Sequence, residues 1–255
     1  MKSTCNLFCL LFLLPLFILT ACGQTKSNTK TNSKSNAIVV LELFTSQGCS
    51  SCPPADKILA YYVLKNNPKI IPLAFHVDYW NYLGWKDPFS KAEFSSRQRE
   101  YAQNFDTDNI YTPQLIINGK HEIIGSNESG IEKLVNQELN LNSEVSLDIT
   151  SATIIRNQLL VNWKTNSLEK NVNINIVLLK KKEFTQIKRG ENSGLKQTSY
   201  NVVFDFKEQA LYANNKNKVF LDFNDTWKID DFIVVAYLQK NHKGAIITAC
   251  QTEIK

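Results

Sequence analysis

The sequence predicts two folded regions, an α/β domain over residues 37–145 and an all-β, sandwich-like domain over residues 146–255. Three observations support this prediction. A Cys-Ser-Ser-Cys motif follows an apolar, β-branched segment and precedes a helical pattern. A Thr-Pro pair precedes a further strand about sixty residues later. The second half alternates apolar and polar residues in about seven short segments and shows no helical pattern, which is typical of an antiparallel sandwich.

The composition is that of a folded protein, with 255 residues of which 43% are hydrophobic and 21% are charged. This length suits one large domain or two ordinary ones. The net charge of +5 divides into +4 for residues 1–36, −4 for residues 37–145 and +5 for residues 146–255. Only four of the 29 basic residues are Arg, so the sequence has no Arg-rich surface and nucleic acid is not an expected partner.

Residues 1–21 have the features of a secretory signal. A lysine precedes the apolar run Leu7–Leu19, which is short for a bilayer span of about 20 residues. The run ends in Ala21-Cys22, and this ending resembles the bacterial lipobox, which implies cleavage after Ala21 and a lipid on the Cys22 thiol. We therefore expect a lipid-anchored, extracytoplasmic protein of the bacterial cell envelope. An uncleaved anchor or a plain signal peptide is the alternative.

Residues 22–36 contain no large apolar side chain, so we expect a disordered tether whose lysines lie near lipid head groups. Cleavage and acylation would leave three free cysteines in a compartment where disulfides persist: Cys49, Cys52 and Cys250. Cys250 stands alone on the last expected strand, where a buried thiol is the expectation.

Cys49 and Cys52 are the predicted catalytic residues. A strand is expected over Ala37–Phe44, and a helix is expected to open at the motif and run to about Lys65. The amino end of a helix stabilises an anion, so a thiolate there has a lowered pKa and is the reactive form. The spacing predicts thiol–disulfide exchange in which Cys49 is the nucleophile and Cys52 the resolving thiol.

The elements that follow have a recognisable order. We expect a strand over Lys69–Val77, a helical insert over about residues 78–108, two strands at Gln114–Asn118 and His121–Ile124, and a helix over Glu128–Leu139. This order resembles the thioredoxin-like fold. In that fold a cis Thr-Pro bond faces the cysteines and offers backbone groups to a substrate, and cis bonds are essentially confined to X-Pro. The resemblance implies that Thr112 and Pro113 form the substrate groove.

Longer strings resemble a family of secreted bacterial thioredoxin-like proteins that is catalogued as a domain of unknown function. The strings are Glu42–Asp56 (ELFTSQGCSSCPPAD), Phe75–Trp80 with Leu83–Phe89, Tyr111–Gln114 (YTPQ), and later Arg189–Asn192 (RGEN) with Asn201–Val203. The resemblance implies export, a thioredoxin-like fold and a redox role without a cofactor, with protein thiols or a redox protein as partner. It implies neither the direction of electron flow nor the substrate.

Three residues are candidates to assist the cysteines. Glu42 lies seven residues before Cys49 and is the nearest analogue of the buried acid of thioredoxins; an exposed or salt-bridged Glu is the alternative. His76 and Asp78 are two residues apart on an extended segment, so their side chains share a side. Asp78 is therefore a candidate to orient His76 beside the thiol, and a purely structural pair is the alternative.

Two other functions compete with the redox enzyme. Cys49, Cys52 and His76 are a possible ligand set for a soft ion such as Cu(I), which would make the protein a metallochaperone. Zinc is not expected, because no second Cys or His pair has ligand spacing. In the other competing function, Cys49 and Cys52 form a structural disulfide in a non-catalytic assembly module.

The second half offers no catalytic motif. Its expected strands lie at Ser146–Thr150, Leu159–Trp163, Val172–Leu178, Asn201–Phe206, Lys218–Phe223, Phe232–Leu238 and Ala245–Thr252.

Overall fold

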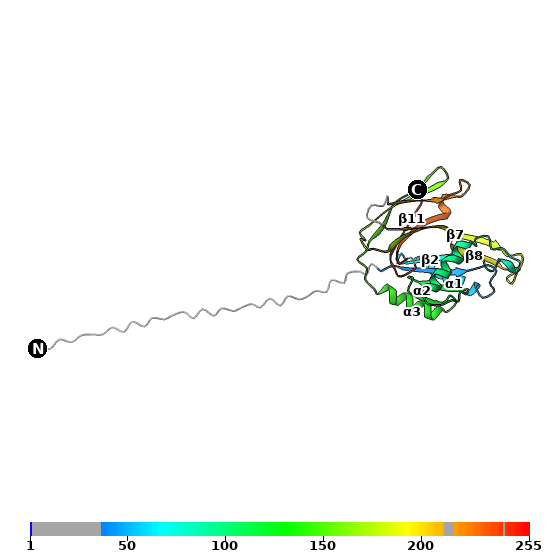
Figure 1. The fold of residues 1–255 in the computed structure, drawn as a ribbon, viewed down its shortest axis with the longest axis horizontal. Coiled ribbons are helices and arrows are strands. Elements are labelled where there is room, and N and C mark those ends of the chain that lie inside the picture. The colour runs from blue at the N-terminus through cyan, green and yellow to red at the C-terminus, as the bar shows by residue number, and fades with distance from the viewer. Residues whose placement is uncertain (2–36, 212–216, 242) are drawn as a thin grey trace. The chain divides into compact units, whose positions relative to one another are not determined.

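The computed structural model describes Met1 and residues 37–211, 217–241 and 243–255. The predicted signal over residues 1–21, Cys22 and the tether over residues 22–36 lie outside the described residues. The described residues from 37 onward belong to one compact unit, which Figure 1 shows as a ribbon. In the part of the chain that the structure describes, no helix combines the length and apolar character needed to cross a membrane.

The first half of this unit contains helices and strands close to those predicted. They are β1 (Val39–Thr45), α1 (Pro53–Lys65), β2 (Ile70–His76), α2 (Ala92–Asn104), β3 (Gln114–Ile117), β4 (His121–Ile124) and α3 (Glu128–Leu139), with a 3-10 turn at Asn81–Leu83. Helix α1 begins after the cysteines, with Cys52 as its N-cap and prolines in its first turn, where a missing N–H is tolerated. Helix α3 begins at Glu128, where the Asn127 side chain accepts a hydrogen bond from the Gly130 amide.

The second half consists of strands, two of them much longer than predicted. The strands are β5 (Leu147–Ile155), β6 (Gln158–Thr165), β7 (Val172–Gln186), β8 (Lys196–Ala210), β9 (Lys218–Asp222), β10 (Phe232–Lys240) and β11 (Ile246–Glu253), with a 3-10 turn at Ile229–Asp231. Strands β7 and β8 have 15 residues each and pair antiparallel along most of their length. The two strands form a long hairpin, in whose outer part β7 alternates half-buried and exposed side chains and β8 alternates buried side chains with less buried ones.

The predicted boundary at residue 146 does not separate two bodies, because the halves share one sheet. The eight-stranded sheet has the order β11-β10-β7-β8-β2-β1-β3-β4. Strand β8 pairs parallel with β2, with Ala74 opposite Val202, and β2 is parallel to β1. Without β8, strand β2 would expose an unpaired, apolar edge, and pairing with the second half removes that edge.

A second, smaller sheet packs against part of the large one. Strands β5, β6 and β9 form a separate three-stranded sheet, and its apolar side chains pack against those of β7 and β10. A second core lies between the large sheet and helix α2, and a third lies beneath helices α1 and α3. The large sheet is therefore covered by helices where it carries the cysteine motif and by strands at its other end (Figure 1).

Candidate functional site

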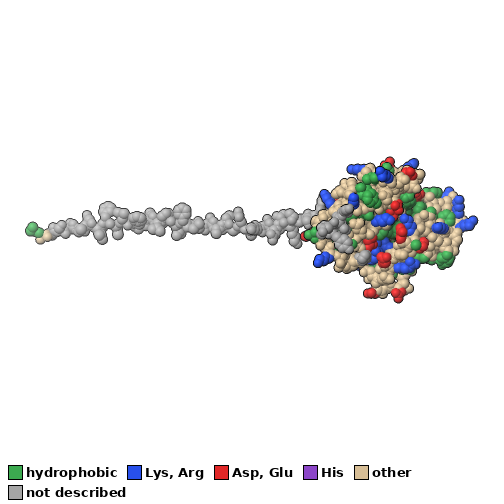
Figure 2. Space-filling view, turned by 45° about the horizontal axis from the view of Figure 1, so that its top comes forward, with side chains coloured by type: hydrophobic (Ala, Val, Ile, Leu, Met, Phe, Trp, Pro, Cys, Tyr) green, Lys and Arg blue, Asp and Glu red, His purple; other side chains and the backbone are tan. Residues whose placement is uncertain are grey.

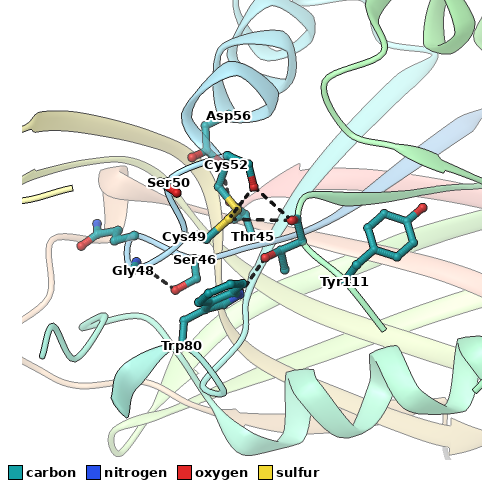
Figure 3. Close-up of a disulfide and its surroundings, with 12 residues drawn as sticks. Thr45, Ser46, Gly48, Cys49, Ser50, Cys52, Asp56, Trp80 and Tyr111 are labelled. Atoms are coloured by element: carbon teal, nitrogen blue, oxygen red, sulfur yellow. Dashed lines mark hydrogen bonds between the residues drawn. A yellow bond between two sulfur atoms is a disulfide. The ribbon is translucent and has the colours of Figure 1, made fainter. Parts of the chain in front are cut away.

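Cys49 and Cys52 form a disulfide at the turn between β1 and α1. Both residues are fully buried, and Figure 3 shows the bond with the residues around it. The turn is closed by the Cys52 amide, which donates to the Cys49 carbonyl at 3.2 Å, and by the Cys49 amide, which donates to the Ser46 carbonyl. The motif is thus held between the end of a central strand and the start of a helix.

Thr112 and Pro113 lie beside the disulfide, and the peptide bond between them is cis. The Thr112 carbonyl oxygen is 3.8 Å from Cys49 Sγ and accepts a hydrogen bond from the Ser51 hydroxyl at 3.3 Å. The Trp80 indole N–H donates to the Thr112 hydroxyl at 2.7 Å, so the insert also holds this segment (Figure 3). The structure therefore brings together the two cysteines and the two predicted groove residues.

Asp56 is the acid beside the disulfide, and it was not among the residues predicted to assist the cysteines. It lies four residues after Cys52 on the same face of α1, as Figure 3 shows. Its carboxylate accepts hydrogen bonds from the Thr45 hydroxyl at 2.9 Å and the Gln197 amide at 2.8 Å. Burial raises the pKa of Asp56 from 3.8 to about 6, although the charge of His76 and the Thr45 hydroxyl act to lower it. Its position four residues after Cys52 in a predicted helix was the sequence feature that could have identified it.

His76 pairs with Asp87 rather than with Asp78. His76 Nδ1 is 2.7 Å from the Asp87 carboxylate, and both side chains are buried. Asp78 instead accepts a hydrogen bond from the Ser95 hydroxyl on α2 at 2.5 Å. Asp78 follows β2 at the point where the chain leaves the strand, so the alternation of sides assumed for His76 and Asp78 does not apply.

The His76–Asp87 pair is linked to the cysteine loop. The Asp87 carboxylate also accepts the Gln47 amide at 2.8 Å. Burial is the largest single effect and lowers the pKa of His76, but the charge and hydrogen bond of Asp87 together with the charge of Asp56 outweigh it, so the net pKa is raised. Burial raises the pKa of Asp87, and the opposing effects of His76 and of two backbone amides leave its pKa lowered. His76 and Asp87 thus form a buried, hydrogen-bonded pair next to the cysteine loop.

Glu42 lies in another cluster. Its carboxylate accepts two hydrogen bonds from the Arg97 guanidinium, at 2.8 and 3.0 Å, one from the Tyr237 hydroxyl at 2.9 Å and one from the Tyr101 hydroxyl. Arg97 is 4% exposed and lies within cation–π distance of four aromatic rings: Phe75, Tyr101, Phe206 and Tyr237. Glu42 is thus a salt-bridged residue, the alternative considered above.

The proposed metal ligands do not form a group of three. Among the described residues, no three His, Cys, Asp or Glu side chains are arranged to hold a metal ion. Cys49 and Cys52 are bonded to each other, and His76 Nδ1 is occupied by Asp87. Cys250 is a free, partly buried cysteine on β11, and burial raises the pKa of its thiol to about 12.

The second half of the chain also contributes to the site. The turn that joins β7 and β8, residues 187–195, is called here the hairpin tip. Asn192 in this tip donates to the backbone carbonyls of Gln47 and Cys49, and Glu191 accepts the Ser50 amide. Gln197, at the start of β8, donates to Asp56 as described above. The string RGEN was the only sequence signal, and nothing in it indicated contact with the cysteines.

The protein has a mixed α/β fold with a buried CxxC disulfide beside a cis-proline. This arrangement is compatible with a redox or a structural role of the disulfide. A family model described as "Protein of unknown function (DUF1223)" matches residues 40–239, so the chain belongs to this family. Comparison with functionally curated proteins finds no match.

Two solved structures share the fold of this chain at low sequence identity, and a third matches it only weakly. A structural-genomics target from Agrobacterium tumefaciens is 24% identical, with a TM-score of 0.66 and coverage of 86% of this chain and 96% of that one. HBP35 of Porphyromonas gingivalis is 15% identical, with a TM-score of 0.60 and coverage of 86% and 76%. A domain of the outer membrane lipoprotein Omp28, also from Porphyromonas gingivalis, covers 44% of this chain with 8% identity and a TM-score of 0.25. The first two similarities show the fold alone.

Proposed function

We propose that the protein is a thioredoxin-like thiol–disulfide oxidoreductase in which Cys49 attacks and Cys52 resolves. The observation that carries the proposal is the position of the cis Thr112–Pro113 segment, whose carbonyl oxygen lies 3.8 Å from Cys49 Sγ. A peptide that docks along this segment would place its own sulfur next to Cys49, which is the proximity that exchange requires.

The exchange balances in two steps. The Cys49 thiolate attacks a substrate disulfide, forms a mixed disulfide and releases one substrate thiolate. The Cys52 thiolate then attacks Cys49 Sγ, forms the Cys49–Cys52 disulfide and releases the second substrate thiolate. The substrate gains two electrons and the pair loses two; the reverse sequence oxidises a substrate dithiol.

Asp56 supplies a proton acceptor for the second step. Cys52 must lose its proton before it attacks, and Asp56 lies one helical turn away with a pKa of about 6, close to neutral pH. The buried position of Cys52 makes bulk water a poor acceptor. The Thr45 and Gln197 donors hold the carboxylate in place without neutralising its charge.

The burial of both sulfurs favours a second candidate, a structural disulfide. The length of the closed loop argues against it, because the bond spans only three positions. On the loop-entropy model such a short loop contributes about 2 kcal/mol of stability, less than a bond that links distant segments. A disulfide placed to stabilise the fold would gain more by joining the two halves of the sheet.

Trapping of a mixed disulfide tests the enzyme. When it is incubated with a model peptide that contains a disulfide, Cys52→Ser should accumulate mixed disulfides between Cys49 and the peptide. Cys49→Ser should not. Cys250→Ser is the matched control, and it should turn over insulin disulfides at the wild-type rate in the presence of dithiothreitol. Absence of trapped species together with absence of both reductase and oxidase activity would overturn the proposal in favour of the structural disulfide.

The proposed location is the extracytoplasmic face of the bacterial cell envelope, with the membrane contacted through lipidated Cys22. The support is the lipobox-like ending at Ala21-Cys22. On the face shown in Figure 2, basic side chains are scattered among acidic ones and form no single patch that would suggest attraction to a nucleic acid. Labelling of cells with an alkyne fatty acid should mark the wild type and leave Cys22→Ala unmarked.

A further inference from the structure

The hairpin tip reaches the cysteine loop from the far half of the sequence. The tip is closed at its base by the Gly194 amide, which donates to the Ile187 carbonyl at 2.8 Å, and by the Ile187 amide, which donates to the Leu195 carbonyl at 2.9 Å. These bonds extend the β7–β8 ladder, so the position of the tip is fixed by two long strands in the large sheet.

Asn192 holds the backbone of the cysteine loop. Its side-chain amide donates to the Gln47 carbonyl at 3.0 Å and to the Cys49 carbonyl at 2.9 Å, on either side of Gly48. A side chain at this position with no amide donor would leave both carbonyls without this partner. One side chain therefore sets the path of the three residues that end at the predicted nucleophile.

The hairpin tip also packs against the aromatic insert, which contacts the cysteine loop. Gly190 has a φ of +75°, which suits glycine, and a Cβ added there would lie 3.1 Å from Trp85 Cβ. Trp85 in turn donates its indole N–H to the Gln47 side chain at 3.1 Å. The cysteine loop is thus held between the aromatic insert and the hairpin tip.

Glu191 brings a negative charge to the same loop. Its carboxylate accepts the Ser50 amide at 3.2 Å, and Ser50 is the residue that follows Cys49. Backbone amides in the turn before a helix are the groups that stabilise a thiolate at a CxxC motif. A carboxylate on this amide occupies one such donor and repels a second negative charge.

We propose that Glu191 and Asn192 are positioning residues of the Cys49–Cys52 pair: Asn192 holds the loop, and Glu191 disfavours the Cys49 thiolate, so that the hairpin tip makes the pair more reducing. The importance of this effect for catalysis rests on the proposed function, but the effect on the Cys49 pKa and on the reduction of the disulfide does not. A less stable thiolate makes the reduced form less stable relative to the disulfide, and a dithiol that is more easily oxidised is a stronger reductant.

The first test is the charge-removing variant Glu191→Gln, which keeps an acceptor for the Ser50 amide. The pKa of Cys49 is read in a Cys52→Ser background from the pH dependence of iodoacetamide labelling, followed on the Cys49 peptide by mass spectrometry. Glu191 is exposed to solvent, and one charge at a helix end changes an equilibrium by roughly two- to fivefold. We expect the apparent acid dissociation constant of Cys49 to rise by that factor.

The second readout uses the intact pair in glutathione buffers. Glu191→Gln should shift the equilibrium toward the reduced pair by a comparable factor at low salt, and by less in 1 M salt, where an exposed charge is screened. Glu183→Gln is the matched control, because Glu183 lies on β7 of the same hairpin and pairs with Lys180 instead of the cysteine loop. It should change neither value.

Asn192→Ala completes the test as a double-mutant cycle. If Asn192 positions the tip, the effect of Glu191→Gln should shrink in the Asn192→Ala background. Identical pKa and glutathione equilibria for Glu191→Gln and wild type at low salt would overturn the proposal, and so would full additivity with Asn192→Ala. A protein that shows these shifts and yet traps no substrate would refute only the proposed function.

Discussion

Two carboxylates lie on the same strand-to-helix unit, the fully buried Glu42 and the half-buried Asp56, and their surroundings differ. Glu42 on β1 meets the Arg97 guanidinium and two tyrosine hydroxyls. Asp56 on α1 accepts hydrogen bonds from a threonine hydroxyl and a glutamine amide, and no described Lys or Arg forms a salt bridge with it.

The difference separates an acid that links elements of the fold through an ion pair from an acid whose pKa is raised toward neutral pH. A guanidinium in contact supplies the opposite charge, and the pair links the elements that carry it. Neutral donors hold a carboxylate without supplying the opposite charge, so burial raises its pKa, in this case to about 6. The acid beside the disulfide is therefore the one suited to accept and release a proton.

The largest expected effect is that of removing the cation from the first cluster. Arg97→Met should lower the free energy of unfolding by about 3–5 kcal/mol at pH 7, because it leaves Glu42 charged and buried without its partner. Urea denaturation measures the change. Arg99→Met, on the same helix but exposed, is the control and should change stability by less than about 0.5 kcal/mol. Equal stability of the two variants would mean that the network does not hold the fold.

Asp56→Asn, in contrast to Arg97→Met, should become more stable relative to wild type as pH rises. The folded pKa of Asp56 is raised above its unfolded value, so ionisation costs stability as pH rises from about 4 to 7. The variant lacks this cost. Its stability relative to wild type should therefore increase by about 1–3 kcal/mol between pH 4 and pH 8, measured by urea denaturation at each pH.

The same variant should slow turnover by at least about tenfold at pH 7, because the proton acceptor for Cys52 is lost. Asp225→Asn, in an exposed turn, is the matched control for both measurements. A pH dependence of stability that is identical in Asp56→Asn and wild type would contradict a raised pKa for Asp56.

The smallest expected effect is that of Thr45→Val, which removes one of the two donors to Asp56 without changing the shape of the side chain. The pKa of Asp56 should rise further, and stability at pH 8 should fall by about 1 kcal/mol. The loss should be smaller at pH 4, where the carboxyl is protonated. Thr153→Val on the exposed face of β5 is the control, and a loss of the same size in both variants would show that the hydrogen bond does not matter.

Local sequence patterns predicted most helices and strands of the first half. Helix α3 has the predicted ends, and strand β3 follows the Thr-Pro pair as expected, because capping residues, prolines and short-range periodicity act within a few residues. The peptide bond before Pro113 is cis, as expected, and Thr112 lies near Cys49, while the substrate groove stays a prediction. His76 pairs with Asp87 and not with Asp78, and Glu42 is salt-bridged, which was the alternative to an assisting role. Both outcomes depended on contacts between distant segments of the chain.

The sequence by itself determined the cysteine pair, the strand before it, the helix after it and the proline opposite, since each follows from a motif or a local periodicity. Only the tertiary structure decided that β8 joins β2, that Arg97 neutralises Glu42 while Asp56 has no such partner, and that Asn192 and Glu191 meet the cysteine loop. The physical reason is that strand-edge pairing and the burial of charge depend on which distant segments come together. Local propensity carries no information about that choice.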